Sequence, residues 1–217
     1  SVRILVISAH PDDEVIGAGG AIARHVANGD TVNWCVVTEG YAPMRTEAEL
    51  AEARRQVYAV QNLLGIESVS FCSFPTIRLN TVPHIELTSA LQAVVDSSKP
   101  DIVYTTPYCD VNIDHRLVCE ATMVATRPLP GGTVKTVLSY EIAPTTRFAA
   151  QPFVPNVYVD ISKFMDIKLQ AMACYKTQLR EFPHPRSLRG LELFARERGL
   201  SIGVEAAECF HLIRRII

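Results

Sequence analysis

The chain has 217 residues, of which 48% are hydrophobic, and this length and apolar content are enough for one buried core. Its formal net charge is −2 and its pI is about 6.3, and no cluster of lysines or arginines occurs, which argues against nucleic acid or an acidic membrane surface as a partner. No run of about 18 apolar residues occurs, so no transmembrane segment is expected.

Strand-like apolar runs alternate with helical patterns along the chain. In chain order we expect strand Val2–Ser8, helix Glu14–Ala27, strand Thr31–Thr38, helix Thr46–Leu64, strand Ser68–Phe74, helix Pro83–Ser98, strand Ile102–Thr106, helix Asp114–Thr126, strands Val134–Ile142 and Val157–Ile161, helices Ser162–Gln178 and Ser187–Arg198, and strand Cys209–Ile217. The βαβαβαβ order of the first seven elements predicts a parallel, twisted sheet covered on both faces. We therefore expect an α/β, Rossmann-like fold with a mostly parallel sheet, as a single domain over residues 1–217.

The six cysteines are widely spaced and include no Cys-x-x-Cys pair. This pattern favours small buried side chains in a reducing compartment over a disulfide framework. The sequence enters a strand pattern at once, without the basic region and cleavage site of a signal peptide. We accordingly expect a cytoplasmic protein.

The most informative segment is Ala9-His10-Pro11-Asp12-Asp13-Glu14, which directly follows the first predicted strand. His10 and Asp13 are three residues apart, so a tight turn can aim both side chains at one metal ion. Asp12 between them points elsewhere and stays free to handle protons. Two candidate ligands with a free carboxylate between them are typical of a metal-dependent hydrolase.

Other polar clusters fall at the same edge of the predicted sheet. Ligands of open parallel sheets bind outside the carboxyl ends of the strands. The segment Thr38-Glu39-Gly40 follows the second strand and Asp110–His115 follows the fourth, as the first motif follows the first strand. His115 is therefore the best candidate for a third ligand beside His10 and Asp13. Three protein ligands leave one position for water, as catalytic zinc sites do.

The chemistry of such a site suggests a role for each residue. A zinc ion lowers the pKa of its bound water to about 7, and a nearby carboxylate can take the remaining proton, so Asp12 is the candidate base. Asn112 or a backbone N–H is a candidate donor to the oxyanion, and Asp114 is expected to orient a ligand. Fe²⁺ or another divalent ion accepts the same types of ligand.

Two simpler interpretations compete with this one. A lone His-x-x-Asp turn can be an ordinary helix cap, but the Asp-His pair at the same sheet edge argues against that explanation. The run Gly17-Ala18-Gly19-Gly20 invites a dinucleotide-binding interpretation, with Glu39 near the position of a ribose-binding acid. These glycines lie inside the predicted helix rather than in the turn before it. Close packing of that helix on the sheet explains them better.

Residues that contact the substrate are harder to predict. Glu39, Arg45 and Arg54 follow the second strand, where they can meet sugar hydroxyls or a phosphate. For Arg54, a simple helix-surface charge is an equal alternative. His184 lies in a proline-rich loop before the last predicted helix and is the fourth candidate.

Taken together, the motifs resemble the PIG-L/LmbE-like zinc-dependent N-deacetylases. The family signature Ala-His-Pro-Asp-Asp-Glu stands here as Ala9–Glu14, followed by Gly-Ala-Gly-Gly at Gly17–Gly20. Supporting matches are Thr38-Glu39-Gly40, Leu64-Gly65-Ile66, Asp114-His115-Arg116, Ser139–Ile142, Val159–Ile161 and Tyr175–Gln178.

The resemblance implies that His10, Asp13 and His115 bind zinc and that Asp12 is the general base. It also implies removal of an acetyl group from an N-acetylglucosaminyl compound or a related amide. Many members carry His-Pro-Asp-His at the downstream motif, whereas this chain has Asn112-Ile113-Asp114-His115. In such members the first histidine stabilises the oxyanion or protonates the leaving amine. Because asparagine cannot supply a proton at neutral pH, we expect Asp12 to return the proton of the water to the leaving nitrogen.

Three functions remain open. The first is a metal-dependent N-deacetylase acting on a small N-acetylated amino sugar, free or linked to a nucleotide or lipid. The second is an amidase for another amide, which the sequence separates poorly from the first. The third is a non-catalytic or nucleotide-binding α/β module, which the metal-site residues disfavour because such a module needs no free base beside a metal. The sequence is also compatible with a homo-oligomer.

Overall fold

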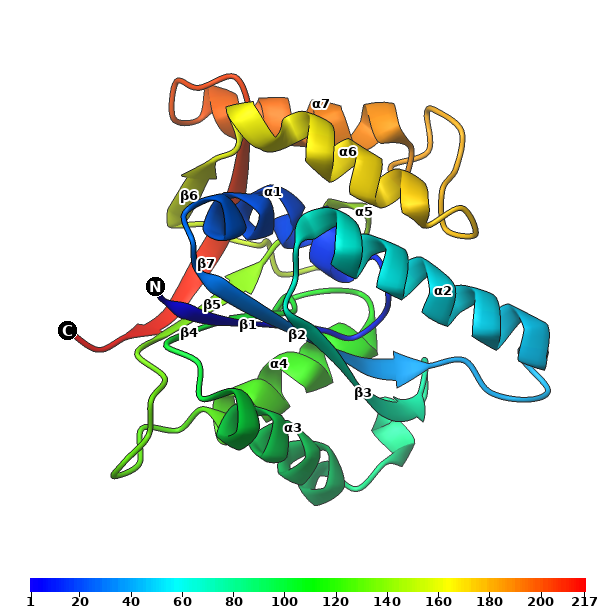
Figure 1. Cartoon of the computed structure of the whole chain (residues 1–217). Coiled ribbons are helices and arrows are strands. Elements are labelled where there is room, and N and C mark those ends of the chain that lie inside the picture. The colour runs from blue at the N-terminus through cyan, green and yellow to red at the C-terminus, as the bar shows by residue number, and fades with distance from the viewer.

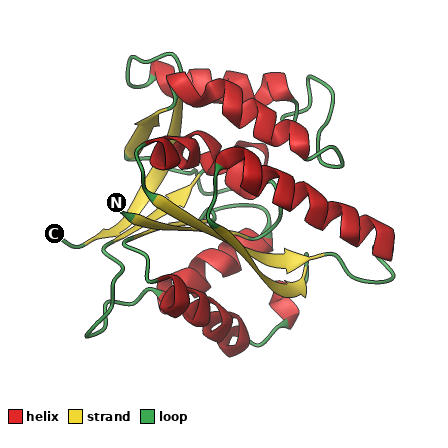
Figure 2. Cartoon of the chain, in the orientation of Figure 1, coloured by secondary structure: helices red, strands yellow, loops and turns green.

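The strands of the molecule form one mixed sheet with helices on both faces, as Figures 1 and 2 show. The computed structural model describes residues 1–217. In chain order the elements are β1 (Arg3–Ser8), α1 (Asp13–Ala27), β2 (Thr31–Glu39), α2 (Glu47–Leu64), β3 (Ser68–Pro75), α3 (His84–Ser98), β4 (Ile102–Thr105), α4 (Ile113–Ala125), β5 (Thr136–Tyr140), α5 (Ala143–Thr146), β6 (Val157–Asp160), α6 (Met165–Cys174), α7 (Leu188–Leu200) and β7 (Ala207–Arg215).

The strand order is β3-β2-β1-β4-β5-β7-β6. The first five strands of the chain pair in parallel, and β7 runs antiparallel to both of its neighbours, β5 and β6. This arrangement confirms the predicted α/β class with a mostly parallel sheet. Most element bounds differ from the predicted ones by no more than the one or two residues by which element ends ordinarily vary.

The helix predicted over Ser162–Gln178 is the exception, and α5 was not predicted at all. The first residues of the predicted helix, Ser162–Phe164, form a 3₁₀ turn, in which the Asp160 carboxylate accepts both the N–H and the O–H of Ser162, at 2.9 and 2.6 Å, and the α-helix α6 begins only at Met165. At the other end the chain leaves the helix at Tyr175, whose side chain is buried against the turn after β1. A tertiary contact therefore outweighs the local helical pattern there.

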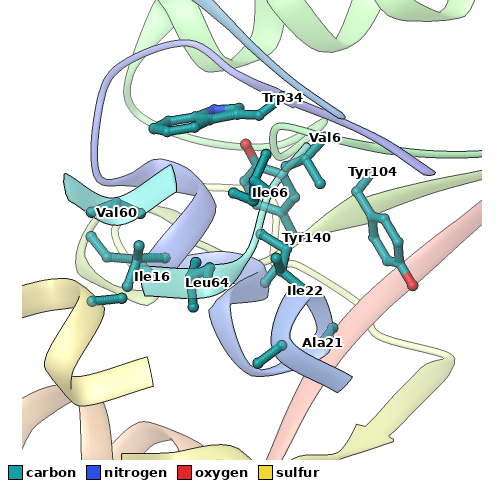
Figure 3. Close-up of a cluster of buried hydrophobic side chains, with 14 of the residues drawn as sticks. Val6, Ile16, Ala21, Ile22, Trp34, Val60, Leu64, Ile66, Tyr104 and Tyr140 are labelled. Atoms are coloured by element: carbon teal, nitrogen blue, oxygen red, sulfur yellow. The ribbon is translucent and has the colours of Figure 1, made fainter. Parts of the chain in front are cut away.

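Each face of the sheet has its own hydrophobic core. Helices α1, α2, α6 and α7 cover one face and α3 and α4 cover the other (Figure 1). The central strand β1 serves both cores, because its side chains alternate: Ile4 and Val6 belong to the first, and Leu5 and Ile7 to the second. Figure 3 shows part of the first core around Trp34.

The strand order places a crevice at the carboxyl ends of β1 and β4. From β1 the chain continues to β2 on one side, while β4 pairs on its other side. Such a reversal of strand order is the usual ligand-binding position of an open α/β sheet. The turn after β1 and the loop after β4 flank this crevice.

Two further observations concern the predictions about membrane-spanning segments and disulfides. No helix has both the length and the apolar character needed to cross a bilayer. All six cysteines are free thiols.

Packing explains the glycine run of α1. A Cβ added at Gly17 would lie 2.3 Å from Cδ2 of Tyr140, and one at Gly20 would lie 2.7 Å from Cβ of Ile161. The Tyr140 ring is fully buried, and its hydroxyl donates a 2.7 Å hydrogen bond to the carbonyl of Ile7. The glycines therefore bring α1 close to the sheet and do not form a phosphate-binding turn.

Gly17→Ala is expected to lower the free energy of unfolding by about 1 to 3 kcal/mol, because the buried Tyr140 ring cannot move away from a new methyl group. Gly19→Ala is the matched control on the same helix, since its Cβ would meet no atom closer than 3.4 Å. That variant should be neutral or stabilised by up to about 1 kcal/mol through helix propensity. Urea denaturation of both proteins checks this, and equal stabilities would contradict the packing account.

Candidate metal centre

Three side chains converge in the crevice between β1 and β4. His10 lies in the turn after β1, Asp13 begins α1 and His115 lies in the first turn of α4. His10 Nδ1 is 3.2 Å from His115 Nε2 and 3.4 Å from Asp13 Oδ2, and His115 Nε2 is 3.3 Å from Asp13 Oδ1. A tetrahedral zinc ion with ligands at about 2.0 to 2.2 Å separates its ligand atoms by about 3.3 to 3.6 Å. The measured distances, which involve both oxygens of Asp13, are close to this separation, and one donor atom from each residue lies within 4.8 Å of the other two, so the three residues can hold one ion.

The charges of this cluster also fit a cation. Asp13 Oδ1 is buried and has no hydrogen-bond partner. Burial would lower the pKa of His10, but Asp13 and Asp114 outweigh it and raise that pKa to about 10. Burial would also lower the pKa of His115, but Asp13 and Asp110 outweigh this effect and raise that pKa to about 9. The buried carboxylates therefore favour positive charge at this position, which a divalent ion would supply.

Each candidate ligand histidine contacts a carboxylate through its other ring nitrogen. His10 Nε2 lies 3.0 Å from Asp114 Oδ2, and His115 Nδ1 lies 3.0 Å from Asp110 Oδ2. Such contacts fix the tautomer and the orientation of a ligating imidazole. Asp114 also accepts the N–H of Ile77, which ties the segment after β3 to the site.

The structure thus places Asp114 where a residue that orients a ligand should be, but its partner is His10 and not the adjacent His115. Neighbouring side chains on a helix point about 100° apart, so Asp114 and His115 cannot face each other. The partner of His115 is Asp110, which the sequence analysis did not select. The only sequence signal for Asp110 was its place in the polar cluster after the fourth strand.

Asp12 lies in the same turn but makes no hydrogen bond to the three candidate ligands. Its backbone is left-handed, with φ of 98°, and its Oδ2 is buried without a hydrogen-bond partner. Burial raises the pKa of the Asp12 carboxyl to about 7. A buried carboxylate with a free oxygen beside a cluster of ligands has the position of a proton acceptor.

Hydrogen bonds of Glu14 and Tyr175 stabilise this turn. Glu14 Oε2 accepts the N–H of Asp12 at 3.2 Å, and Glu14 Oε1 accepts the hydroxyl of Tyr175. Both side chains are fully buried, and burial raises the pKa of Glu14 well above its ordinary value. The unusual backbone of Asp12 is therefore supported by a contact between residues 161 positions apart.

Asn112 is placed at the N-terminus of α4. Its Oδ1 accepts the N–H of Asp114 at 2.9 Å, which makes it the capping residue of that helix. The amide nitrogen of Asn112 has no hydrogen bond inside the protein and stays available as a donor.

The candidate substrate residues lie further out and interact with neighbours. Arg54 donates to Glu39 at 2.9 Å and stacks on the ring of Phe71, 4.2 Å from its centroid. Arg45 pairs with Glu49 at 3.7 Å and is half-exposed.

His184 occupies the loop between α6 and α7, where its Nδ1 accepts the N–H of Arg186 at 3.0 Å. The side chain from this loop that approaches the site is Arg186, whose Nε lies 3.9 Å from Asp12 Oδ2. From the segment His184-Pro185-Arg186-Ser187 the sequence analysis chose His184 rather than Arg186, because no spacing rule relates Arg186 to the first motif.

A cavity of about 290 Å³ adjoins Asp110. This volume is near the lower end of the range for small-molecule sites, about 300 to 1,000 Å³. The cavity is lined by Tyr108, Cys109, Asp110, Val111, Arg116 and Ala149–Gln151.

Asp110→Asn is expected to weaken zinc binding by about 10- to 100-fold, because the His115 ring loses the carboxylate that orients it. Thr145→Val is the matched control, since the Thr145 hydroxyl donates to the same Asp110 oxygen at 2.7 Å but does not touch His115. Competition with a chromogenic chelator measures both affinities. Unchanged zinc affinity in Asp110→Asn would show that this contact does not support metal binding.

Comparison with known proteins agrees with the site. The family model described as PIG-L, GlcNAc-PI de-N-acetylase, matches residues 5–126. The chain is 29% identical to the uncharacterized deacetylase YaiS of Escherichia coli over 183 residues, which cover 80% of this chain and 90% of YaiS. It is 26% identical to the diacetylchitobiose deacetylase of Thermococcus kodakarensis over 197 residues, 82% of this chain and 71% of the relative.

Among solved structures, GalB, the 4-carboxy-2-hydroxymuconate hydratase of Pseudomonas putida KT2440, superposes with a TM-score of 0.82. The match covers 100% of this chain and 98% of GalB at 20% identity, so it concerns the fold alone. The family model, in contrast, matches more than half of the chain and includes every candidate metal ligand. The chain belongs to the PIG-L family of deacetylases.

Proposed function

We propose that the protein is a metal-dependent hydrolase that removes the acetyl group from an N-acetylated amino sugar. The observation that carries this proposal is the buried, unpartnered oxygen of Asp12 beside the converging donors of His10, Asp13 and His115. A binding module has no use for a free base at that position. The similarity to a diacetylchitobiose deacetylase supports the choice of an N-acetylated sugar.

His10, Asp13 and His115 would hold the ion. Two imidazole nitrogens and one carboxylate with these spacings suit Zn²⁺, and Fe²⁺ accepts the same donors. When bound, such an ion lowers the pKa of a coordinated water and polarises the carbonyl under attack.

Asp12 acts as the base. Its free oxygen takes a proton from the attacking water while the water oxygen bonds to the carbonyl carbon of the acetamido group. The C–N bond then breaks, and Asp12 returns the proton to the leaving nitrogen, so that acetate and a free amine result. Asn112 donates hydrogen bonds but cannot provide this proton.

The substrate side suits a small polar molecule. Tyr108, Gln151 and Arg116 are among the residues that line the cavity beside Asp110. Further proposed contacts to sugar hydroxyls come from four side chains that are all at least partly exposed: Glu39, Arg45, Arg54 and His184. A sugar that carries a nucleotide or lipid would extend beyond this cavity.

Released acetate tests reaction class and substrate together. The zinc-loaded protein should release acetate from at least one of N-acetylglucosamine, its nucleotide-linked form and diacetylchitobiose, and a chelator should abolish the release. Hydrolysis of unrelated amides alone would favour a different amidase. If no stoichiometric divalent ion binds and added zinc gives no hydrolysis, the enzyme hypothesis fails.

Asp12→Asn should abolish turnover, with a loss of about 100-fold or more, because the amide cannot accept the proton of the water. Zinc should remain bound in this variant, since Asp12 is not among the converging donors. Asn112→Ala should only weaken turnover. Steady-state acetate release with parallel metal analysis measures both variants, and equal residual activities would contradict the division of roles.

A further inference from the structure

One arginine faces the candidate base directly. The Arg186 side chain is 28% exposed, and its Nε lies 3.9 Å from Asp12 Oδ2, beyond hydrogen-bond distance. Its guanidinium donates no hydrogen bond inside the protein, and the Asp12 oxygen that it faces accepts none. Two complementary groups therefore face each other with neither one satisfied.

Three other arginines at this end of the sheet already have acceptors, and Arg78, which has none, stacks on the ring of Tyr41, 5.3 Å from its centroid. Arg54 donates to the carboxylate of Glu39, and Arg198 forms two hydrogen bonds with Glu141. Arg116 donates to the carbonyl of Asp110. Arg186 is thus a guanidinium that reaches the base without a protein acceptor of its own.

The position of Arg186 is fixed by its backbone. Its N–H donates to His184 Nδ1 at 3.0 Å, and its carbonyl accepts the N–H of Arg180 at 3.4 Å. The next residue, Ser187, caps α7 by accepting the N–H of Gly190 at 3.0 Å. The loop therefore holds this side chain over the turn after β1.

We propose that Arg186 is a catalytic residue that donates hydrogen bonds to the oxyanion formed when the acetamido carbonyl is attacked. This inference rests on the proposed function of the site. An attacking oxygen hydrogen-bonded to Asp12 Oδ2 lies about 2.7 Å from that atom. In the tetrahedral intermediate the attacking oxygen and the oxyanion share one carbon, so the oxyanion forms close to the same carboxylate. A guanidinium that lies 3.9 Å from this carboxylate oxygen is within reach of it.

The charge of Arg186 suits this role better than the amide of Asn112. A guanidinium stays protonated at all working pH values and offers five donors, whereas an amide is neutral. Donors aimed at developing charge in a desolvated site lower the barrier more than donors aimed at the ground state. During attack the carbonyl electron pair moves to oxygen and Asp12 takes the proton of the water. On collapse the C=O bond re-forms and the C–N bond breaks, while Arg186 keeps all its protons.

The test compares Arg186→Ala and Arg186→Lys with Arg189→Ala, in the zinc-loaded full chain. Arg189 is the matched control, because it lies three residues further on and only stacks on Phe182, 4.4 Å from the ring centroid. Arg186→Ala should lower kcat on diacetylchitobiose by about 100- to 1,000-fold with little change in KM. The kcat of Arg186→Lys should lie between those of Arg186→Ala and the wild type. Guanidinium chloride added at a non-denaturing concentration should partly restore the kcat of Arg186→Ala.

A second readout does not depend on turnover. Methylphosphonate has the methyl group and the anionic tetrahedral oxygens of the attacked acetyl group, and its binding can be followed by phosphorus NMR. Arg186→Ala should lose this binding while its zinc affinity matches that of the wild type. Wild-type kcat in Arg186→Ala, or methylphosphonate binding equal to that of the wild type, would overturn the proposal. If the wild type hydrolyses no N-acetyl sugar, the proposed function fails, and methylphosphonate binding still decides the role of Arg186.

Discussion

The site depends on the contacts that the Asp13 carboxylate makes with the imidazole rings of His10 and His115. One of the Asp13 oxygens accepts the backbone N–H of His10 at 2.8 Å, so it shapes the turn after β1 as well as facing the candidate metal position. The other oxygen faces His115 from α4 and has no hydrogen bond. Burial would raise the pKa of Asp13, but the two histidines outweigh it and hold that pKa well below its ordinary value. A fully buried anion of this kind needs a counter-charge, which the two histidines can supply and a divalent ion would replace.

The same turn separates two carboxylates that are adjacent in the sequence. Asp12 has a left-handed backbone and is not among the three residues whose donor atoms converge, whereas Asp13 is. Glu14 fixes this conformation through the Asp12 N–H, and Glu14 is in turn held by Tyr175. The six-residue motif therefore holds a candidate ligand and a candidate base in adjacent positions with the support of a distant segment, through the contact of Glu14 with Tyr175.

The sequence was enough to predict those features of the structure that depend on the local spacing of apolar and polar residues. Alternating apolar runs gave the element order, and the three-residue spacing of His10 and Asp13 indicated one metal position. The rule for the carboxyl ends of parallel strands then added His115. The early end of α6, the partner Asp110 and the approach of Arg186 were missed, because each depends on contacts between segments that no spacing relates. The sequence also proposed Asp114 as an orienting residue, and its contact with His10 became visible only in three dimensions.

The fold by itself does not decide the chemistry, because a hydratase shares it with a TM-score of 0.82. The hydrolase assignment therefore depends on the converging donors of His10, Asp13 and His115 and on the unpartnered Asp12 oxygen beside them. The most direct test is crystallography of the zinc-soaked protein, with anomalous diffraction measured on both sides of the zinc absorption edge. A single peak within bonding distance of His10 Nδ1, His115 Nε2 and an Asp13 oxygen, with Asp12 left uncoordinated, is the predicted result. A peak coordinated by Asp12, or no peak at this crevice, would contradict the assignment of ligand and base.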